Sequence, residues 1–108
     1  FLRHGRIGHE VDAVARAHIT AAGYEEYAHG LGHQIGQFAH DGGMRLAPTW
    51  ELFGRRPFGV VEQGNVFTIE PNAGTPNYGR VSLEEDVLVT ADGCRFLSTP
   101  QRELICLE

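Results

Sequence analysis

Residues 28–41 read AHGLGHQIGQFAHD and hold three of the chain's six histidines, His29, His33 and His40. Three glycines lie among them, and because glycine is a poor helix former we expect an extended or turning backbone here. Imidazoles gathered this closely bind a transition metal, move protons near neutral pH, or pack as hydrogen-bonded structural residues. The stretch therefore predicts a shaped loop or strand, and acidic side chains elsewhere decide which of these roles applies.

One well-known zinc-binding arrangement is excluded by the residues themselves. A His-Glu-x-x-His site needs both histidines on one face of a helix, with a glutamate between them. Here Gly-Leu-Gly separates His29 from His33, so both the residue identities and the expected conformation differ.

Composition limits the classes of protein to which the chain can belong. Its 108 residues make one domain at most, and its formal net charge is −5. All nine basic residues are arginines scattered along the chain, so no basic stripe indicates a nucleic acid or an anionic membrane surface as partner.

Targeting signals and cysteine usage indicate a location. No apolar run approaches the roughly 18 residues of a membrane helix, and the amino end lacks a signal-peptide core. We expect Cys94 and Cys106 to be buried thiols of a reducing compartment, which predicts a cytoplasmic protein. Because the sequence begins with Phe1 and not Met, we also expect it to be the end of something longer.

Hydrophobic periodicity predicts one helix followed by strands. Apolar residues recur at three- and four-residue spacing from His9 to Ala22, and Gly23 suits the position after a helix. Apolar and β-branched runs predict strands over residues 66–70, 81–90, 94–98 and 103–107, with a hairpin turn at residues 91–93. The long connection over residues 42–63 carries three large aromatic residues, which either shape a binding site or form a cluster beneath a surface loop.

Two of the predicted strands each carry a glutamate among apolar residues, Glu70 and Glu84. If these strands pair antiparallel, both carboxylates lie on one face of the sheet, toward the histidine stretch. Histidine together with carboxylates suits Mn, Co, Fe or Zn. The alternative for residues 84–86 is a solvated run of charges.

Four segments of the chain resemble the pita-bread metallopeptidases, a family that contains methionine aminopeptidases, aminopeptidase P and prolidase. The segments are EVDAVAR at residues 10–16, HGLGH running to His40 and Asp41, VFTIEP at residues 66–71 and LEEDVLVT at residues 83–90. They occur in the family's order and approximate spacing. The resemblance implies an α+β fold, a curved antiparallel sheet backed by helices, with residues 1–108 as the carboxy-terminal portion of a single catalytic domain whose upstream portion is absent.

The resemblance also implies roles for individual residues around two divalent ions (Mn, Co or Zn). By motif position His33 is a terminal ligand of one ion, Glu70 a ligand of that same ion, and Glu84 a carboxylate that bridges both. His40 matches the histidine that contacts the scissile carbonyl or the tetrahedral intermediate, and His29 matches a second substrate-facing imidazole. Glu70 is also the candidate for moving the proton between attacking water and leaving amine.

The implied activity is that of a metal-dependent exopeptidase that removes an N-terminal residue, of the Xaa-Pro type found in aminopeptidase P or prolidase. Its substrate is a peptide, and because proline-specific members are often dimers, the resemblance also points to a homodimer. Manganese is among the implied metals.

The chain departs from the family pattern in two places. The family supplies two Asp ligands from a strand pair upstream of the first helix, and no residue in positions 1–8 replaces them, so we expect the isolated segment to be inactive. Ser82 also stands where proline-specific members often carry an arginine, and Arg80 has the same strand parity.

Two further functions remain open. One is a pita-bread domain that has lost its metals and binds peptides or proteins, which is a pseudoenzyme or binding module. The other is a creatinase-like reaction that uses the same scaffold without metal on a small non-peptide substrate. Retention of His33, Glu70 and Glu84 favours the metal-using peptidase.

Overall fold

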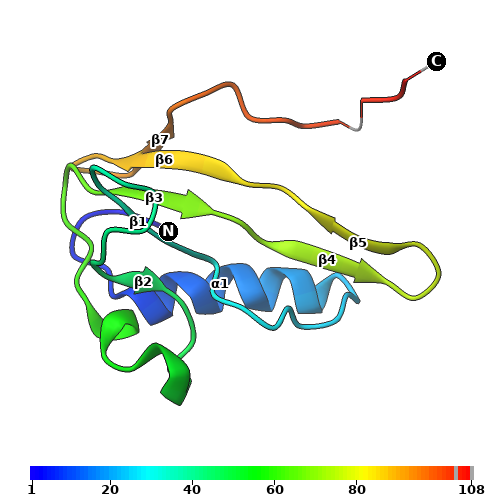
Figure 1. The fold of residues 1–108 in the computed structure, drawn as a ribbon, viewed down its shortest axis with the longest axis horizontal. Coiled ribbons are helices and arrows are strands. Elements are labelled where there is room, and N and C mark those ends of the chain that lie inside the picture. The colour runs from blue at the N-terminus through cyan, green and yellow to red at the C-terminus, as the bar shows by residue number, and fades with distance from the viewer. Residues whose placement is uncertain (104, 108) are drawn as a thin grey trace.

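The structure is a computed structural model that describes residues 1–103 and 105–107, and it contains one layer of sheet and one covering helix (Figure 1). Along the chain the elements are α1 (Gly8–Ala21), β1 (Gly32–Ile35), β2 (Arg45–Leu46), the 3₁₀ helices η1 (Glu51–Phe53) and η2 (Arg56–Phe58), β3 (Val66–Ile69), β4 (Asn72–Thr75), β5 (Gly79–Ser82), β6 (Glu85–Val89) and β7 (Cys94–Phe96).

Helix α1 confirms the helix predicted between His9 and Ala22, with bounds shifted by one residue. The Glu10 carboxylate accepts a 3.4 Å hydrogen bond from the Ile7 N–H, which satisfies one of the donors left open at the helix start. Gly23 ends the helix with a φ of +89°, a conformation that side chains with a Cβ rarely adopt. The helix is not long and apolar enough to cross a membrane, and neither is any other helix within the described part of the chain.

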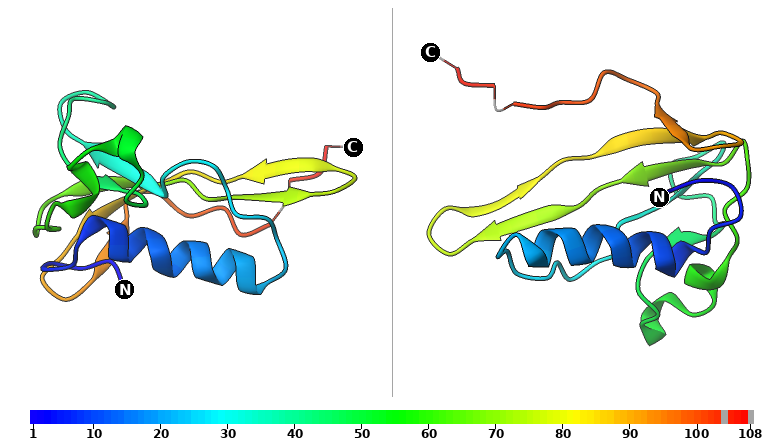
Figure 2. Two further views of the ribbon diagram at one scale, coloured as in Figure 1. Left: turned by 90° about the horizontal axis from the view of Figure 1, so that it is seen from below. Right: turned by 180° about the vertical axis from the view of Figure 1, so that it is seen from behind.

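The main sheet has the order β2-β1-β3-β6-β7, and each neighbouring pair of strands is antiparallel. Helix α1 lies along one face of this sheet (Figure 2). Near the sheet centre His33 on β1 and Thr68 on β3 are buried, whereas Glu70, just after β3, is partly exposed.

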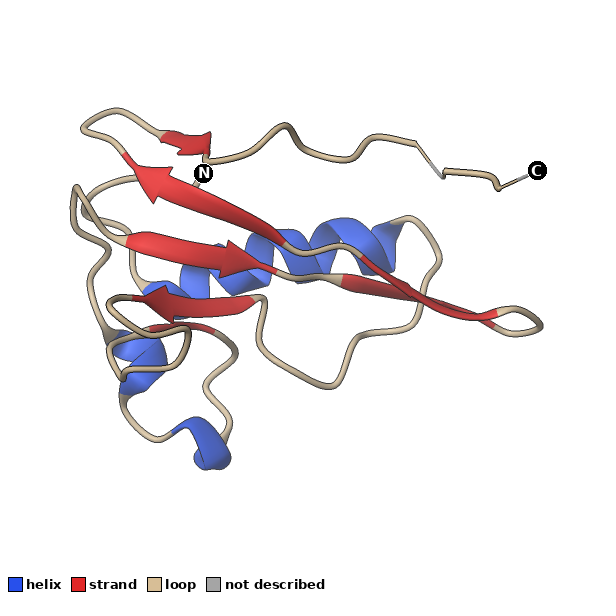
Figure 3. Ribbon diagram, turned by 45° about the horizontal axis from the view of Figure 1, so that its top comes forward, coloured by secondary structure: helices blue, strands red, loops and turns tan. Residues whose placement is uncertain are grey.

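Strands β4 and β5 form a two-stranded ribbon that continues β3 and β6 away from the sheet (Figure 3). The register is the same on both sides of the junction, because Ile69 pairs with Glu85 and Asn72 pairs with Ser82. The strand predicted over residues 81–90 is therefore divided between β5 and β6. The turn that joins β4 to β5 consists of residues 76–78.

The carboxy-terminal predictions were partly wrong. β7 confirms the returning strand but ends at Phe96, and its exposed position at the sheet edge leaves Cys94 exposed. Cys106 is exposed as well, so the expectation of buried thiols was wrong. Of the strand predicted over residues 103–107, Leu104 lies outside the described residues, and the other four positions are not in a strand.

The core lies between α1 and the sheet. Phe67 and Val87, on the central strands, are almost completely buried, and Val11 of the helix packs in the same cluster. Farther along α1, the predicted apolar stripe lines an open groove of about 730 Å³ between the helix and the sheet. This apolar groove is lined by Val14 and Ile19 of the helix and by Ile69 and Phe96 of the sheet, among others.

Candidate active site and metal centre

His33 lies on β1, between β2 and β3, with only 7% of its surface exposed. The neighbouring Gly32 packs so closely on β3 that a Cβ at this position would collide with the Thr68 carbonyl oxygen. The His33 N–H donates a 3.0 Å hydrogen bond to the Thr68 hydroxyl. The glycine thus permits the strand approach that fixes His33 beside β3.

The His33 ring faces Glu70. Its Nε2 atom lies 3.7 Å from Glu70 Oε1, and its Nδ1 atom lies 3.2 Å from the Gln34 carbonyl oxygen. Because a carbonyl oxygen accepts and never donates, Nδ1 carries the proton in this arrangement. In the neutral imidazole Nε2 then carries the lone pair, and this atom faces the carboxylate.

Glu70 is held by two hydrogen bonds. The Thr68 hydroxyl donates to Glu70 Oε1 at 3.0 Å, and the Glu70 N–H donates to the Leu31 carbonyl oxygen at 2.7 Å. The single hydroxyl of Thr68 therefore accepts from the backbone of His33 and donates to Glu70. This contact couples the positions of the two predicted ligands.

Glu84 lies in the short break between β5 and β6 and is exposed. The shared register of the ribbon places it opposite Glu70, and directly opposed residues of an antiparallel pair project from the same face. The antiparallel pairing on which the sequence prediction depended is therefore present. Within residues 1–103 and 105–107, however, no three His, Cys, Asp or Glu side chains gather closely enough to hold a metal ion.

His40 lies on the loop after β1 and stacks on His33, with ring centroids 4.0 Å apart. Its imidazole is exposed. Both rings border a small cavity of about 90 Å³ that Arg45 and Arg56 also line. The structure thus brings His33, Glu70 and His40 together.

His29 is separate from this group. Its ring packs against Tyr27, with centroids 4.9 Å apart, and both of its ring nitrogens have polar neighbours, the Gly30 carbonyl oxygen and the Asn72 side chain. Sequence reasoning missed Asn72, for which the only signal was its position two residues after Glu70.

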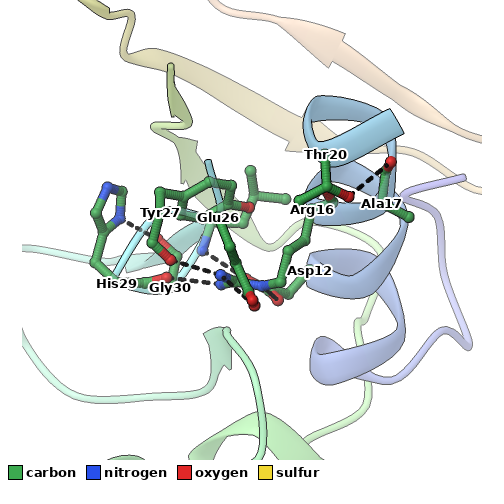
Figure 4. A network of polar contacts seen from close by, with 9 residues as sticks. Asp12, Arg16, Ala17, Thr20, Glu26, Tyr27, His29 and Gly30 are labelled. Carbon is green, nitrogen blue, oxygen red and sulfur yellow. Dashed lines mark hydrogen bonds and ion pairs between the residues drawn. The ribbon is translucent and has the colours of Figure 1, made fainter. Parts of the chain in front are cut away.

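A buried ion pair holds the backbone around His29 (Figure 4). Arg16 binds both carboxylate oxygens of Asp12, at 2.9 and 3.0 Å, and donates to the carbonyl oxygens of Tyr27 and His29, at 2.6 and 2.7 Å. Asp12 in turn accepts the Leu31 N–H at 2.9 Å. Sequence reasoning did not predict this pair, although the i, i+4 spacing of Asp12 and Arg16 was a signal for it.

Burial changes the proton affinities within this network. Burial alone would lower the pKa of Arg16, but the hydrogen bond and the negative charge of Asp12 outweigh it and raise that pKa above its ordinary value. Burial, with the charge of Asp12, raises the pKa of Tyr27 to about 12. Among the described residues, the buried Tyr27 hydroxyl has no hydrogen-bond partner.

A comparison with known protein families supports the resemblance that the four sequence segments indicated. The sequence profile of Metallopeptidase family M24 matches residues 1–91. The chain belongs to this family.

Relatives within M24 include proteins named for proline-specific cleavage. The chain is 34% identical to an Xaa-Pro dipeptidase of Pyrococcus furiosus, over 94% of its own length and 27% of the relative's. It is 35% identical to an uncharacterized peptidase of Bacillus subtilis, YqhT, over 98% of its own length and 28% of the relative's. The chain therefore spans little more than a quarter of these relatives.

Solved structures give the same result for the fold. An Xaa-Pro dipeptidase from Bacillus anthracis superposes with a TM-score of 0.80 at 36% identity, covering 98% of this chain and 28% of that one. A prolidase from Pyrococcus horikoshii OT3 superposes with a TM-score of 0.78 at 35% identity, covering 95% and 28%. The antiparallel sheet with its helix is thus part of the α+β pita-bread fold that the resemblance implied.

Two donor atoms of this M24 chain, His33 Nε2 and Glu70 Oε1, are spaced as two ligands of one metal ion would be. In the neutral imidazole Nε2 and the carboxylate oxygen would each offer a lone pair to a metal ion. Their separation of 3.7 Å is too long for a hydrogen bond between them. Two donors at about 2.1 Å from one tetrahedral ion lie roughly 3.4 Å apart, close to the separation seen here. A histidine that donates its other ring N–H to a backbone carbonyl is also typical of metal ligands.

Proposed function

We propose that this chain is part of a metal-dependent peptidase that hydrolyses Xaa-Pro peptides, of the prolidase or aminopeptidase P type. The observation that supports this most is the convergence of His33 Nε2 on Glu70 Oε1, with the His40 ring stacked alongside. Relatives that are named Xaa-Pro dipeptidases support the choice of substrate.

In this proposal His33, Glu70 and Glu84 are the metal ligands that this chain contributes to a site for two divalent ions, Mn, Co or Zn. Glu84 is included because the pairs on either side of it, Ile69 with Glu85 and Asn72 with Ser82, support a position opposite Glu70. The chemistry that bound divalent ions supply is activation of water at neutral pH and polarisation of the scissile carbonyl. The family's two upstream Asp ligands are expected outside these 108 residues.

The chain's own side chains hold and move protons in the proposed reaction. The Thr68 hydroxyl occupies one lone pair of Glu70 Oε1, and the rest of the carboxylate is available to take a proton from water and pass it to the leaving amine. An N–H of His40 donates to the oxygen on which negative charge develops, which stabilises the transition state more than the ground state. Because the His40 side chain is exposed and stacks on His33 through its face, an N–H at the ring edge can make this contact.

The experiment is hydrolysis of Xaa-Pro dipeptides by the protein expressed from its complete reading frame, with Mn²⁺ and with a chelator. We expect His33→Ala and Glu70→Gln to lower kcat/KM at least 100-fold and to lower the metal content of the purified protein. His18→Gln and Glu62→Gln, which alter exposed residues outside the site, are the matched controls. Activity that persists in the chelator would contradict the proposed metal dependence.

The metal-free binding module is the second candidate function, because only two of the predicted donors gather within the described residues. A protein that purifies without metal, stays inactive with added Mn²⁺ and still binds Xaa-Pro peptides would establish that alternative. We also propose a homodimer in the cytoplasm, to be tested by sedimentation and cell fractionation.

A further inference from the structure

The Asn72 side chain joins His29 to Arg80. Asn72 Nδ2 lies 2.6 Å from His29 Nε2, and Asn72 Oδ1 lies 3.0 Å from a terminal nitrogen of Arg80. Asn72 is on β4 and Arg80 on β5, so one strand of the ribbon contacts His29 and the other strand holds the Asn72 side chain that makes this contact. Arg80 is also 3.7 Å from the exposed Glu25 carboxylate.

Arg80 determines which way the Asn72 amide points. A guanidinium has donors and no acceptor, so the Asn72 atom that faces it must be the oxygen. The amide NH₂ then faces His29, and because NH₂ only donates, His29 Nε2 must accept. A reversed amide would place two donors against each other at Arg80.

The contact of the other ring nitrogen, His29 Nδ1, independently indicates that the proton is on Nδ1. His29 Nδ1 lies 2.6 Å from the Gly30 carbonyl oxygen, which only accepts, so Nδ1 carries the proton. Arg16 holds the His29 carbonyl oxygen at 2.7 Å, which fixes the backbone from which the ring projects. Both ring nitrogens thus favour one neutral tautomer, with the proton on Nδ1.

We propose that Asn72 and Arg80 are positioning residues that hold His29 in the Nδ1–H tautomer, with Nε2 as a hydrogen-bond acceptor. On the proposed peptidase function, His29 then meets the peptide substrate as an acceptor for an ammonium or amide N–H, which replaces the Asn72 amide. It does not polarise a carbonyl oxygen, whereas His40 is the donor. The two substrate-facing histidines therefore have opposite hydrogen-bonding roles.

The test of the tautomer is NMR of the complete protein labelled with ¹⁵N in histidine. We expect wild-type His29 to show a protonated Nδ1 and an unprotonated Nε2. Asn72→Asp replaces the donor with an acceptor and should move the proton to Nε2, whereas Arg80→Met should release the amide and give a mixture of tautomers. Arg80→Lys keeps a donor and should restore the wild-type spectrum.

Asn77→Asp, at the tip of the same ribbon, and Arg95→Met, on the exposed strand β7, are matched controls that should leave the His29 signals unchanged. In the dipeptide assay we expect Asn72→Asp and Arg80→Met to raise KM roughly tenfold with kcat little changed. A wild-type His29 protonated on Nε2, or signals that Asn72→Asp and Arg80→Met both leave unchanged, would overturn the proposal. The predicted tautomer in a protein without peptidase activity would overturn the proposed function alone.

Discussion

Tyr27 lies completely buried beneath the Arg16 guanidinium, 4.2 Å from its ring centroid. Its pKa is raised from 10.0 to about 12, so the folded protein holds the phenol proton more tightly than the unfolded chain. The resulting stabilisation is complete below pH 10 and is lost as the pH rises to about 12. We expect roughly 2 kcal/mol of the unfolding free energy to be lost over this window.

Tyr27→Phe should remove this part of the pH dependence in urea unfolding of the complete protein. The variant should also be about 1 kcal/mol more stable at neutral pH, because it removes a buried hydroxyl without a described partner. Tyr78→Phe, at a ring that is 91% exposed, is the control. A Tyr27→Phe variant that is markedly less stable would show that the hydroxyl does bind a partner.

Thr68 connects the backbone of His33 to the carboxylate of Glu70. Thr68→Val keeps the shape of the side chain but removes both hydrogen bonds, so we expect Mn²⁺ affinity, measured by calorimetry on the complete protein, to fall by about 10- to 100-fold. Thr68→Ser should retain most of the affinity. Thr99→Val, at an exposed position, is the matched control, and an unchanged affinity for Thr68→Val would rule out this coupling.

At the scale of single residues, the sequence predicted which side chains lie near one another better than it predicted their hydrogen-bond partners. Motif position predicted His33 and Glu70 as ligands of one metal ion, and in the structure the two side chains lie 3.7 Å apart. Asn72 could not be predicted, because its role depends on a ribbon register and on a ring from a distant loop. Motif position gave His29 a substrate-facing role but not the hydrogen-bonding state of its ring.

Gly32 limits how closely β1 and β3 can approach. Gly32→Ala would place a methyl group against the Thr68 carbonyl oxygen, so the strands must separate and His33 must shift. We expect a loss of stability of about 2 kcal/mol and a lower metal content in the purified protein. Gly93→Ala, where a Cβ meets only an ordinary contact with Thr90, is the control. An unchanged metal content for Gly32→Ala would show that this approach does not position the ligand.

Local periodicity predicted α1, β3 and the hairpin between β6 and β7, because each is a continuous pattern with clear end signals. Strand β4 was missed because Asn-Ala-Gly-Thr has weak strand propensity. These residues are extended in the structure because they pair with β5. The strand predicted over residues 103–107 had the right composition but no neighbouring strand to pair with among the described residues.

The molecule as a whole leaves the apolar groove open between α1 and the sheet. We expect the 108-residue chain to bind the dye ANS there, because large apolar surfaces accessible to water take up such probes. Ile19→Glu, on the groove, should lower the fluorescence enhancement at least twofold. Val60→Glu, at an exposed valine elsewhere, should not. Equal enhancement in both variants would place the dye at another surface.

Motif order was sufficient to predict the family and the α+β sheet, since four segments in sequence specify an arrangement that none of them specifies alone. Burial of individual groups was less predictable. Cys94 and Cys106 were expected inside but are exposed, and Val14 of the apolar stripe is 46% exposed. The exposure of a side chain depends on which other elements pack over its face of the helix or strand. The sequence of that one helix or strand does not specify those neighbours.

The uninterrupted register from β3–β6 into β4–β5 makes the chain sensitive to length in one region and tolerant in another. One residue inserted just after Pro71 would reverse the facing of every following β4 side chain, and would turn Asn72 away from His29. An epitope inserted at residues 76–78, where the ribbon turns, leaves all of these pairings in place. A reporter attached at the ribbon tip should therefore leave the contact between Asn72 and His29 intact.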